Sequence, residues 1–180
     1  MNETQLVTAC LNGDRKAQRA LYDTYSRKML GICMRYVSDR EIARDILQEG
    51  FIKVFTSLRS FAGTGSLEAW MRMIFVNEAL GYLRRTDTWH KCEDVNVANS
   101  LPDEGESAVS KMSADELVCL IGQLPPGFRT VFNMYTVEGY SHREIAATLN
   151  ITESTSRSQY VRARKWLQEQ IRKTGYGPGC

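Results

Sequence analysis

Apolar residues recur at intervals of three and four along most of the chain, whereas the alternation of apolar and polar positions that marks strands is almost absent. Glycine and proline gather at a few points between these stretches, where they favour turns. The pattern therefore predicts an all-α protein. The expected helices span residues 14–36, 39–58, 67–85, 114–122, 128–137, 141–149 and 153–171.

Two of these helices, 39–58 and 67–85, differ in how their apolar residues are distributed. The first has inward apolar positions at Ile42, Ile46, Leu47, Phe51, Val54 and Phe55. Its outward polar positions are Asp45, Gln48, Glu49 and Lys53. The second helix is apolar on nearly every side, at Trp70, Met71, Met73, Ile74, Phe75, Val76, Leu80 and Leu83. We therefore expect it at the centre of an N-terminal bundle, with a polar edge made of Arg72, Asn77, Tyr82, Arg84 and Arg85.

The periodicity fails after residue 86, where proline, glycine and acidic residues take over. We expect two small helical domains, over residues 1–86 and 112–174, joined by a flexible acidic linker over 87–111 and followed by a tail over 175–180. The net charge of +2, from 23 Lys and Arg against 21 Asp and Glu, is too small to indicate a nucleic-acid-binding protein by itself. Basic residues nevertheless gather at the end of the first domain and along the last helix, which predicts two contact surfaces.

The cysteines and histidines offer little chemistry. The 5 cysteines form no CxxC pair, and no signal peptide is recognisable at the start, so we expect a protein of the reduced cytoplasm. No apolar run approaches the roughly 20 residues that span a bilayer. His90 and Cys92 lie close together, but two candidate ligands fall short of a zinc site, and a solvated linker is the favoured interpretation over a metal site.

The C-terminal end carries the pattern of a helix-turn-helix. Ser141 and Glu144 have the spacing of a capping box, and residues 150–152 form a turn. At 100 degrees per residue, the following helix places Ser156, Tyr160, Ala163, Leu167 and Ile171 on one side. The opposite side holds Arg157, Ser158, Val161, Arg162 and Lys165. A stripe of this kind is suited to reading base edges and binding phosphates, although a solvated basic face gives the same pattern.

Three segments together resemble the sigma-70 family, and more narrowly its two-domain extracytoplasmic-function (ECF) type. They begin with Asp45-Ile46-Leu47-Gln48-Glu49-Gly50-Phe51, Trp70-Met71-Arg72-Met73-Ile74 and Leu124-Pro125-Pro126-Gly127-Phe128. The resemblance implies a dissociable subunit of bacterial RNA polymerase that selects promoter DNA and helps to melt it. It implies no active site and no cofactor.

The resemblance also assigns site residues. For core-polymerase binding, on the clamp helices of the largest subunit, these are Asp45, Gln48, Glu49, Phe51 and Lys53, although ordinary helix solvation also explains the polar ones. For the minus-10 element they are Phe61, Ala62, Gly63, Thr64, Gly65, Ser66, Arg72, Asn77, Arg84 and Arg85. For the minus-35 element they are Ser154, Thr155, Arg157, Ser158, Val161, Arg162 and Lys165. Phe61 has the chemistry to stack on a base that is flipped out of the duplex; alternatively, Phe61 and Trp70 close the core of the bundle.

Three positions depart from the family pattern. Ala62 stands where many relatives carry a basic residue, Gly81 is a poor helix former, and Ser156 thins the apolar stripe of the last helix. The acidic linker residues are either a mimic of nucleic-acid phosphate or an inert tether, and they are Glu93, Asp94, Asp103, Glu104 and Glu106.

Partners and rival interpretations follow from the same resemblance. Besides the polymerase clamp and flap, an anti-sigma factor is a partner that the family raises, but nothing in the sequence identifies one. The strongest rival is an independent helix-turn-helix regulator whose N-terminal bundle senses a ligand or dimerises. An enzyme is a poorer interpretation, because neither His90 nor His142 has a Cys or Asp partner in a shared motif.

Overall fold

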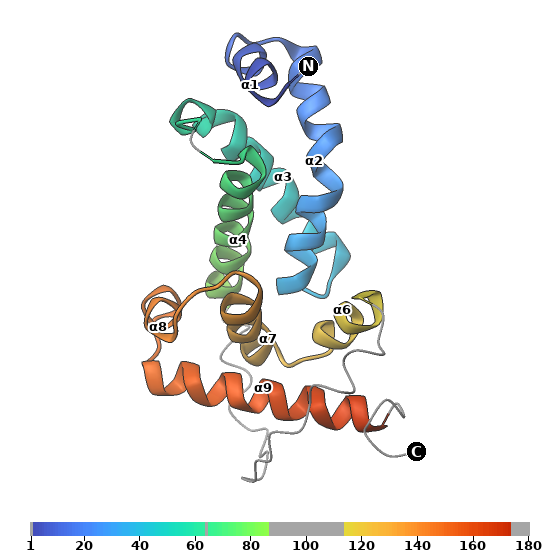
Figure 1. Ribbon diagram of the computed structural model, residues 1–180, viewed down its shortest axis with the longest axis vertical. Coiled ribbons are helices and arrows are strands. Elements are labelled where there is room, and N and C mark those ends of the chain that lie inside the picture. The colour runs from blue at the N-terminus through green and yellow to red at the C-terminus, as the bar shows by residue number, and fades with distance from the viewer. Residues whose placement is uncertain (1, 64, 87–113, 174–180) are drawn as a thin grey trace. The chain divides into compact units, whose positions relative to one another are not determined.

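The computed structural model describes residues 2–63, 65–86 and 114–173, and the regular elements within these ranges are all helices (Figure 1). The predicted all-helical fold is confirmed. The chain divides into two compact units, one ending at Arg85 and the other beginning at Thr86. The expected linker, with its acidic residues, and the expected tail lie outside the described residues.

The first unit contains four α-helices and a short 3-10 turn. They are α1 (Glu3–Leu11), α2 (Arg15–Tyr36), α3 (Arg40–Ser57), η1 (Leu58–Ser60) and α4 (Leu67–Arg85). Carboxylates cap α2 and α3, since Asp14 accepts from the amides of Lys16 and Ala17 and Asp39 accepts from those of the second and third residues of α3. The sequence prediction placed these starts correctly but missed α1.

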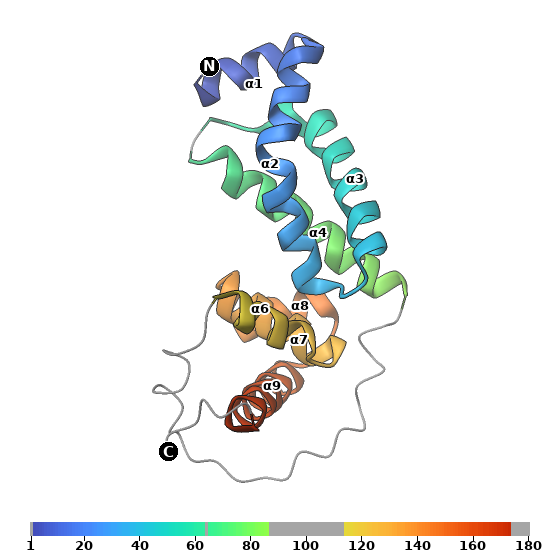
Figure 2. The same ribbon diagram turned by 90° about the vertical axis from the view of Figure 1, so that its right-hand side faces the viewer.

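The core of the first unit lies where α2, α3 and α4 pack against one another in every pairing (Figure 2). The ring of Phe51 on α3 lies 4.6 Å from that of Tyr22 and 5.2 Å from that of Phe75, measured between centroids. Gly50 allows this approach, because a Cβ at that position would lie 2.2 Å from Cε1 of Phe75. The absence of a side chain at residue 50 therefore sets the spacing of α3 and α4.

α4 packs against both α2 and α3, as expected of a helix at the centre of the bundle, but not all of its apolar residues are covered. Met73 is 58% exposed, and Trp70 and Ile74 are only half-buried. The helix is covered by its neighbours on one side, where its buried residues are Leu67, Met71, Phe75, Val76, Ala79, Leu80 and Leu83. The other side of α4 is a surface that includes an exposed methionine.

The described part of the second unit, residues 114–173, is a smaller helical bundle. It contains α6 (Ala114–Gly122), α7 (Pro126–Phe132), the π-helical turn η3 (Asn133–Val137), α8 (His142–Leu149) and α9 (Glu153–Lys173). Its core joins α6, α7 and α9 through Leu120, Ile121, Leu124, Phe128, Ala163, Leu167 and Ile171. The buried Arg129 donates through Nη1 to the carbonyl of Gly122 at 2.7 Å, which satisfies a backbone acceptor at the end of α6.

The boundaries of α7 correct the sequence prediction of one helix over 128–137. The helix begins two residues earlier, because proline has no amide hydrogen to satisfy and Pro126 occupies the first turn. It ends at Phe132, where the backbone widens into η3, and the Glu138 amide donates to the carbonyl of Asn133 at 3.0 Å. The end of α8 was predicted correctly, since Asn150 adopts the left-handed conformation at φ 57° and ends this helix.

The capping box that opens α8 is confirmed. The Ser141 hydroxyl accepts from the amide of Glu144 at 3.3 Å, and the Glu144 carboxylate accepts from the amide of Ser141 at 2.8 Å. A hydrogen bond from the Ser141 hydroxyl, followed by the one from its amide, lowers the pKa of Glu144. No helix within the described ranges is long and apolar enough to cross a membrane.

Candidate functional site

The outer face of α3 is a row of exposed residues one to two helical turns long. Asp45, Gln48 and Glu49 are exposed, as the apolar pattern predicted. Ile52 continues the row and is 56% exposed, although it is a large aliphatic residue. At 100 degrees per residue, Asp45, Gln48 and Ile52 fall within about 60 degrees of one another. An apolar side chain thus stands at the centre of a polar face.

Phe51 faces inward, as the apolar pattern predicted, although the resemblance lists it among the polymerase contacts. It is 4% exposed and lies in the core between the rings of Tyr22 and Phe75. A side chain enclosed in this way has no surface to offer a partner. The resemblance suggested Phe51 as a contact, but the exposed apolar residue of α3 is its neighbour Ile52, which the sequence analysis did not single out.

Lys53 has a partner inside the first unit. Its Nζ lies 2.5 Å from Oε1 of Glu78 on α4, and the Glu78 side chain is only 12% exposed. The ion pair spans the α3–α4 interface beside the close contact of Gly50 with Phe75. This arrangement supports a role for Lys53 in holding the two helices together.

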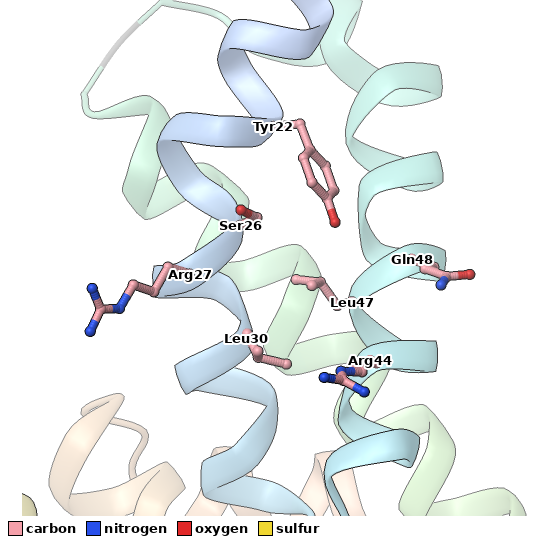
Figure 3. Close-up of a pocket in the computed structure, with 7 residues that line it drawn as sticks. All are labelled: Tyr22, Ser26, Arg27, Leu30, Arg44, Leu47 and Gln48. Atoms are coloured by element: carbon pink, nitrogen blue, oxygen red, sulfur yellow. The ribbon is translucent and has the colours of Figure 1, made fainter.

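A hollow of about 330 Å³ lies between α2 and α3, next to the exposed face (Figure 3). Figure 3 shows Tyr22 and Leu47 pointing into the space between the two helices, whereas Arg27 and Gln48 extend outward on opposite sides. Arg44, which also lines the hollow, pairs with Glu41 at 2.5 Å. The sequence analysis missed the α2 contribution, because no local pattern shows which residues of two separate helices border one hollow.

The loop between η1 and α4 carries two residues with positive φ. They are Gly63, at φ 70°, and Gly65, at φ 88°, a region that side chains with a Cβ rarely adopt. Ala62, Gly63, Gly65 and Ser66 are exposed, whereas Thr64 lies outside the described residues. The loop therefore presents backbone, with little side-chain cover, on its outer side.

The ends of this loop are held by side-chain contacts. Phe61 is half-buried, and its ring lies 5.6 Å from that of Trp70 at an interplanar angle of 50°. The Ser66 hydroxyl accepts from the amide of Ala69 at 3.4 Å, as expected of a helix cap. Of the two interpretations of Phe61, the contact with Trp70 favours closure of the bundle, while the exposed part of the ring leaves room for stacking.

The predicted polar edge of α4 is partly exposed. Asn77, Arg84 and Arg85 are exposed, and Arg72 is half-buried. Met73 lies within about 40 degrees of Asn77 on the helix and belongs to the same surface. This edge combines cationic, amide and apolar groups, which suits contact with an unpaired nucleic-acid strand.

The face of α9 opposite its buried stripe carries the predicted basic residues. Ser154, Arg157, Ser158 and Val161 are exposed, and Thr155, Arg162 and Lys165 are partly so. Ser156, Ala163, Leu167 and Ile171 are buried, so the division of the helix into two faces was predicted correctly.

Three contacts organise the start of α9. Arg157 is paired with Glu153 one turn earlier, so its guanidinium is held against the helix. The hydroxyl of Thr155 lies 2.8 Å from that of Thr152, and the Ser158 hydroxyl donates to the carbonyl of Thr155 at 3.0 Å. The small polar residues therefore support the helix end, which leaves the arginine and lysine side chains as the long groups of this face.

His142 ties α8 to α9. Its Nδ1 lies 2.9 Å from Oγ of the fully buried Ser156, and its ring stacks on Tyr135 at 4.4 Å with an interplanar angle of 14°. Tyr160 approaches the same ring edge-on at 5.7 Å. Burial, followed by the nearby Arg157, lowers the pKa of His142 below its ordinary value, which Glu153 opposes. The sequence analysis left this histidine without a partner.

Within residues 2–63, 65–86 and 114–173, no three His, Cys, Asp or Glu side chains gather closely enough to hold a metal ion. His90 and Cys92 lie outside these ranges. The exposed surfaces of α3, α4 and α9 are therefore the candidate functional sites, and each is suited to binding a macromolecule.

Two family models match the chain. The model described as Sigma-70 region 2 covers residues 21–88, and the model described as Sigma-70, region 4 covers residues 114–167. These ranges contain α3 and α4 in the first case and most of α9 in the second.

Whole-length relatives agree with these matches. The chain is 31% identical over 183 residues to the ECF RNA polymerase sigma-E factor of Haemophilus influenzae, covering 95% of this chain and 96% of the relative. It is 29% identical over 180 residues to the RNA polymerase sigma-H factor of Pseudomonas aeruginosa, covering 94% and 93% respectively. A structure of the sigma factor RpoE in complex with the anti-sigma factor NepR from Bartonella quintana has a similar fold, with a TM-score of 0.50, 19% identity and coverage of 86% of this chain and 96% of that one.

Proposed function

The chain belongs to the sigma-70 family, as an ECF RNA polymerase sigma factor that acts in transcription initiation without enzymatic activity, and we propose that its two units divide promoter recognition between them. In this proposal the first unit, over residues 1–86, binds core polymerase and the minus-10 element. The second, over residues 112–174, binds the minus-35 element and the polymerase flap. The observation that carries the division is that each unit buries an apolar core of its own and exposes a helix face suited to a different partner.

The proposed docking surface for the clamp helices of the largest polymerase subunit is the outer face of α3. Asp45, Gln48 and Glu49 supply polar contacts, and Ile52 supplies the apolar anchor that the centre of an interface requires. The adjoining hollow between α2 and α3 gives a partner side chain a place to insert. Lys53 supports this surface from behind through its pair with Glu78.

The proposed minus-10 surface combines the loop over 61–66 with the polar edge of α4. The exposed backbone at the two glycines lets amide groups approach a base or a phosphate. Asn77 offers hydrogen bonds to a base, and Arg72, Arg84 and Arg85 neutralise the strand. A base held by this surface cannot restack, which favours the melted state of the promoter.

The proposed minus-35 surface is the basic face of α9, with α8 as the supporting helix of the helix-turn-helix. Arg157 and Arg162 are the residues suited to bidentate contacts with guanine, and Lys165 is suited to phosphate. Ser154, Thr155, Ser158 and Val161 complete the face. The fixed position of α9 against α7 and α8 presents these groups on a rigid element.

A regulatory partner and the cellular location are part of the proposal. Because the related RpoE structure holds an anti-sigma factor, we include a partner of this kind, whose binding to the α3 or α9 face would keep the chain from polymerase or promoter. The chain acts where bacterial polymerase and DNA lie, in the cytoplasm.

Run-off transcription with added core polymerase on genomic fragments tests the proposal as a whole. Promoter-specific transcripts that depend on the chain are expected, and they would also give the promoter sequence. An independent helix-turn-helix regulator would bind DNA without converting core polymerase to promoter-specific initiation, and that outcome would overturn the proposal.

Variants of α3 test the docking surface by co-purification with core polymerase. Gln48→Ala with Glu49→Ala, and separately Ile52→Ala, are expected to reduce the polymerase retained. Leu11→Ala is the matched control, because Leu11 is also an exposed aliphatic residue of the first unit, at 39%, but lies on α1. Retention equal to that of the wild type in both α3 variants would remove this surface from the proposal.

A further inference from the structure

An unusual hydrogen bond joins the first helix of the first unit to the start of its last helix. The Glu3 carboxylate on α1 accepts through Oε1 from the amide of Leu67 at 3.1 Å, across 64 residues. Leu67 is the first residue of α4 and directly follows the loop over 61–66. The first amides of a helix have no partner inside that helix and are usually capped by a residue adjacent in sequence. Here a distant helix supplies one of the acceptors.

The same helix also meets the other end of the loop. α1 packs against α2 and against η1, the turn that directly precedes Phe61. In both Figure 1 and Figure 2, α1 lies beside the end of α3, where η1 begins. One helix thus contacts the residues just before the loop and bonds to the residue just after it.

The position of Glu3 is itself fixed by local structure. Asn2 and Gln5 form a capping box, with hydrogen bonds of 3.0 and 2.8 Å. Asn2 is the N-cap of α1, so Glu3 is the first residue of the helix. Val7 and Cys10 are buried and hold the helix to the unit, and burial raises the pKa of the Cys10 thiol. Glu3 is therefore presented to α4 from a short but anchored helix.

The electrostatics of the contact favour a carboxylate. The N-terminus of a helix carries a partial positive charge, so an anion placed there stabilises it. Glu68, the acidic residue in the first turn of α4, is directed to Lys28 on α2 at 2.6 Å. The acceptor for the Leu67 amide consequently comes from α1, although α4 has an acid of its own nearby.

We propose that Glu3 is a positioning residue for promoter melting: by capping α4 at Leu67 while α1 packs on η1, it holds both ends of the loop that receives the extruded base. The proposal rests on the proposed role of the loop in the minus-10 site. Two residues with positive φ make the middle of the loop conformationally permissive, so its geometry depends on its ends. Glu3 touches no DNA and acts through the backbone of Leu67.

Two substitutions of Glu3 separate the cap from the side-chain volume. In Glu3→Ala the acceptor is lost, and open-complex formation on a duplex promoter, read as permanganate reactivity of unpaired thymines, is expected to fall about fivefold, as for the loss of a helix cap. In Glu3→Gln the amide oxygen still accepts, and most of the activity is expected to return. Thr4→Ala, on the same helix, is the control and is expected to behave like the wild type.

Two readouts distinguish failure of this proposal from failure of the proposed function. Core-polymerase retention and transcription from a pre-melted promoter bubble are expected to be unchanged in Glu3→Ala, since neither depends on capturing a base from the duplex. Hydrogen exchange of the Leu67 amide, measured on the full chain without polymerase, is expected to be faster in Glu3→Ala than in Glu3→Gln. Unchanged permanganate reactivity, or equal loss in both variants, would overturn the positioning role. Absence of promoter melting by the wild-type chain would instead overturn the proposed function.

Discussion

His142 and Ser156 lie 14 residues apart in sequence, and a 2.9 Å hydrogen bond joins Nδ1 of the one to Oγ of the other. Ser156 is completely buried on the side of α9 that packs against the rest of the second unit. In the sequence, this serine interrupts an otherwise apolar stripe of the last helix. The structure instead gives it a polar partner on the first turn of α8. The two helices of the helix-turn-helix are therefore joined by a hydrogen bond as well as by packing.

Ser156→Ala is expected to lower the free energy of unfolding of the second unit by about 1 to 2 kcal/mol, because the half-buried ring of His142 loses its hydrogen-bond partner. Thermal unfolding followed by circular dichroism measures the effect. Ser154→Ala, at an exposed position of the same helix turn, is the control. Equal melting temperatures for the two variants would show that the hydrogen bond contributes nothing to stability.

The stability of the second unit is expected to fall as the pH drops below about 6.5, the ordinary pKa of histidine. Burial and Arg157 lower the pKa of folded His142, so the unfolded chain binds a proton at a higher pH than the folded chain does. The contribution is therefore intact above the unfolded pKa and is lost as the pH falls through the lower, folded value. Glu153, which opposes the shift, and the rings of Tyr135 and Tyr160 also face the histidine.

Melting temperatures at pH 7.5, 6.5 and 5.5 test this dependence. His142→Gln keeps a hydrogen-bonding group but removes the titration, so its pH dependence over this range is expected to be shallower. The matched control is His90→Gln, since His90 is the other of the chain's 2 histidines. Parallel pH profiles for the wild type and His142→Gln would contradict the assignment.

Two glycines of the first unit are expected to respond in opposite directions to the same change. Gly50→Ala places a methyl group 2.2 Å from Phe75, and overpacking of this kind destabilises by about 1 to 3 kcal/mol. Gly81→Ala meets nothing closer than Nη1 of Arg85 at 3.7 Å, and it is expected to stabilise α4 by about 0.5 to 1 kcal/mol through helix propensity. Urea denaturation of both variants measures the difference, and a shift in the same direction for both would be inconsistent with the packing described.

The basic face of α9 is expected to bind the minus-35 element through its arginines. Arg157→Ala and Arg162→Ala are each expected to weaken binding by about 1 to 3 kcal/mol, the usual contribution of a base-contacting arginine. A gel shift with holoenzyme measures the loss. Arg172→Ala, near the other end of α9, is the control and is expected to change little.

The ion pair of Arg157 with Glu153 gives a second test of the same face, in which the expected change is stronger and not weaker DNA binding. Glu153→Gln removes a negative charge near the proposed phosphate path and releases the guanidinium, so it is expected to strengthen DNA binding. The gain is expected to shrink as salt is raised. Weaker binding by Glu153→Gln would mean that the pair itself holds Arg157 in its DNA-binding position.

Much of the fold could be predicted because its signals are local. Asp14 and Ser141 cap helices through contacts two or three residues away, and Asn150 ends a helix by its own backbone angle. The exposed positions of α3 follow from the helical repeat in the same way. The resemblance to the sigma-70 family, carried by three segments, then supplied the expected polymerase and promoter contacts, which no local pattern contains.

The remaining features depend on residues that meet only in three dimensions. The pairing of Lys53 with Glu78 and the stacking of His142 on Tyr135 join separate elements, so neither partner is marked in the sequence. Phe51 was correctly predicted to face inward, and only the resemblance to the family listed it as a contact, because a resemblance carries over a position without showing whether its side chain is exposed. The exposure of Met73 was missed because α4 has apolar residues around most of its circumference. The pattern therefore does not show which side of the helix has no neighbouring helix.

The close contact at Gly50 has a mechanical consequence. Phe75 lies against the backbone of α3 at Gly50, and Lys53 pairs with Glu78, so sliding of α3 along α4 would break both contacts. In the proposed function polymerase binds α3 and the promoter strand lies on α4, so the two binding surfaces keep a fixed spacing. Under this proposal, the position at which polymerase binds α3 also determines where the promoter strand is held.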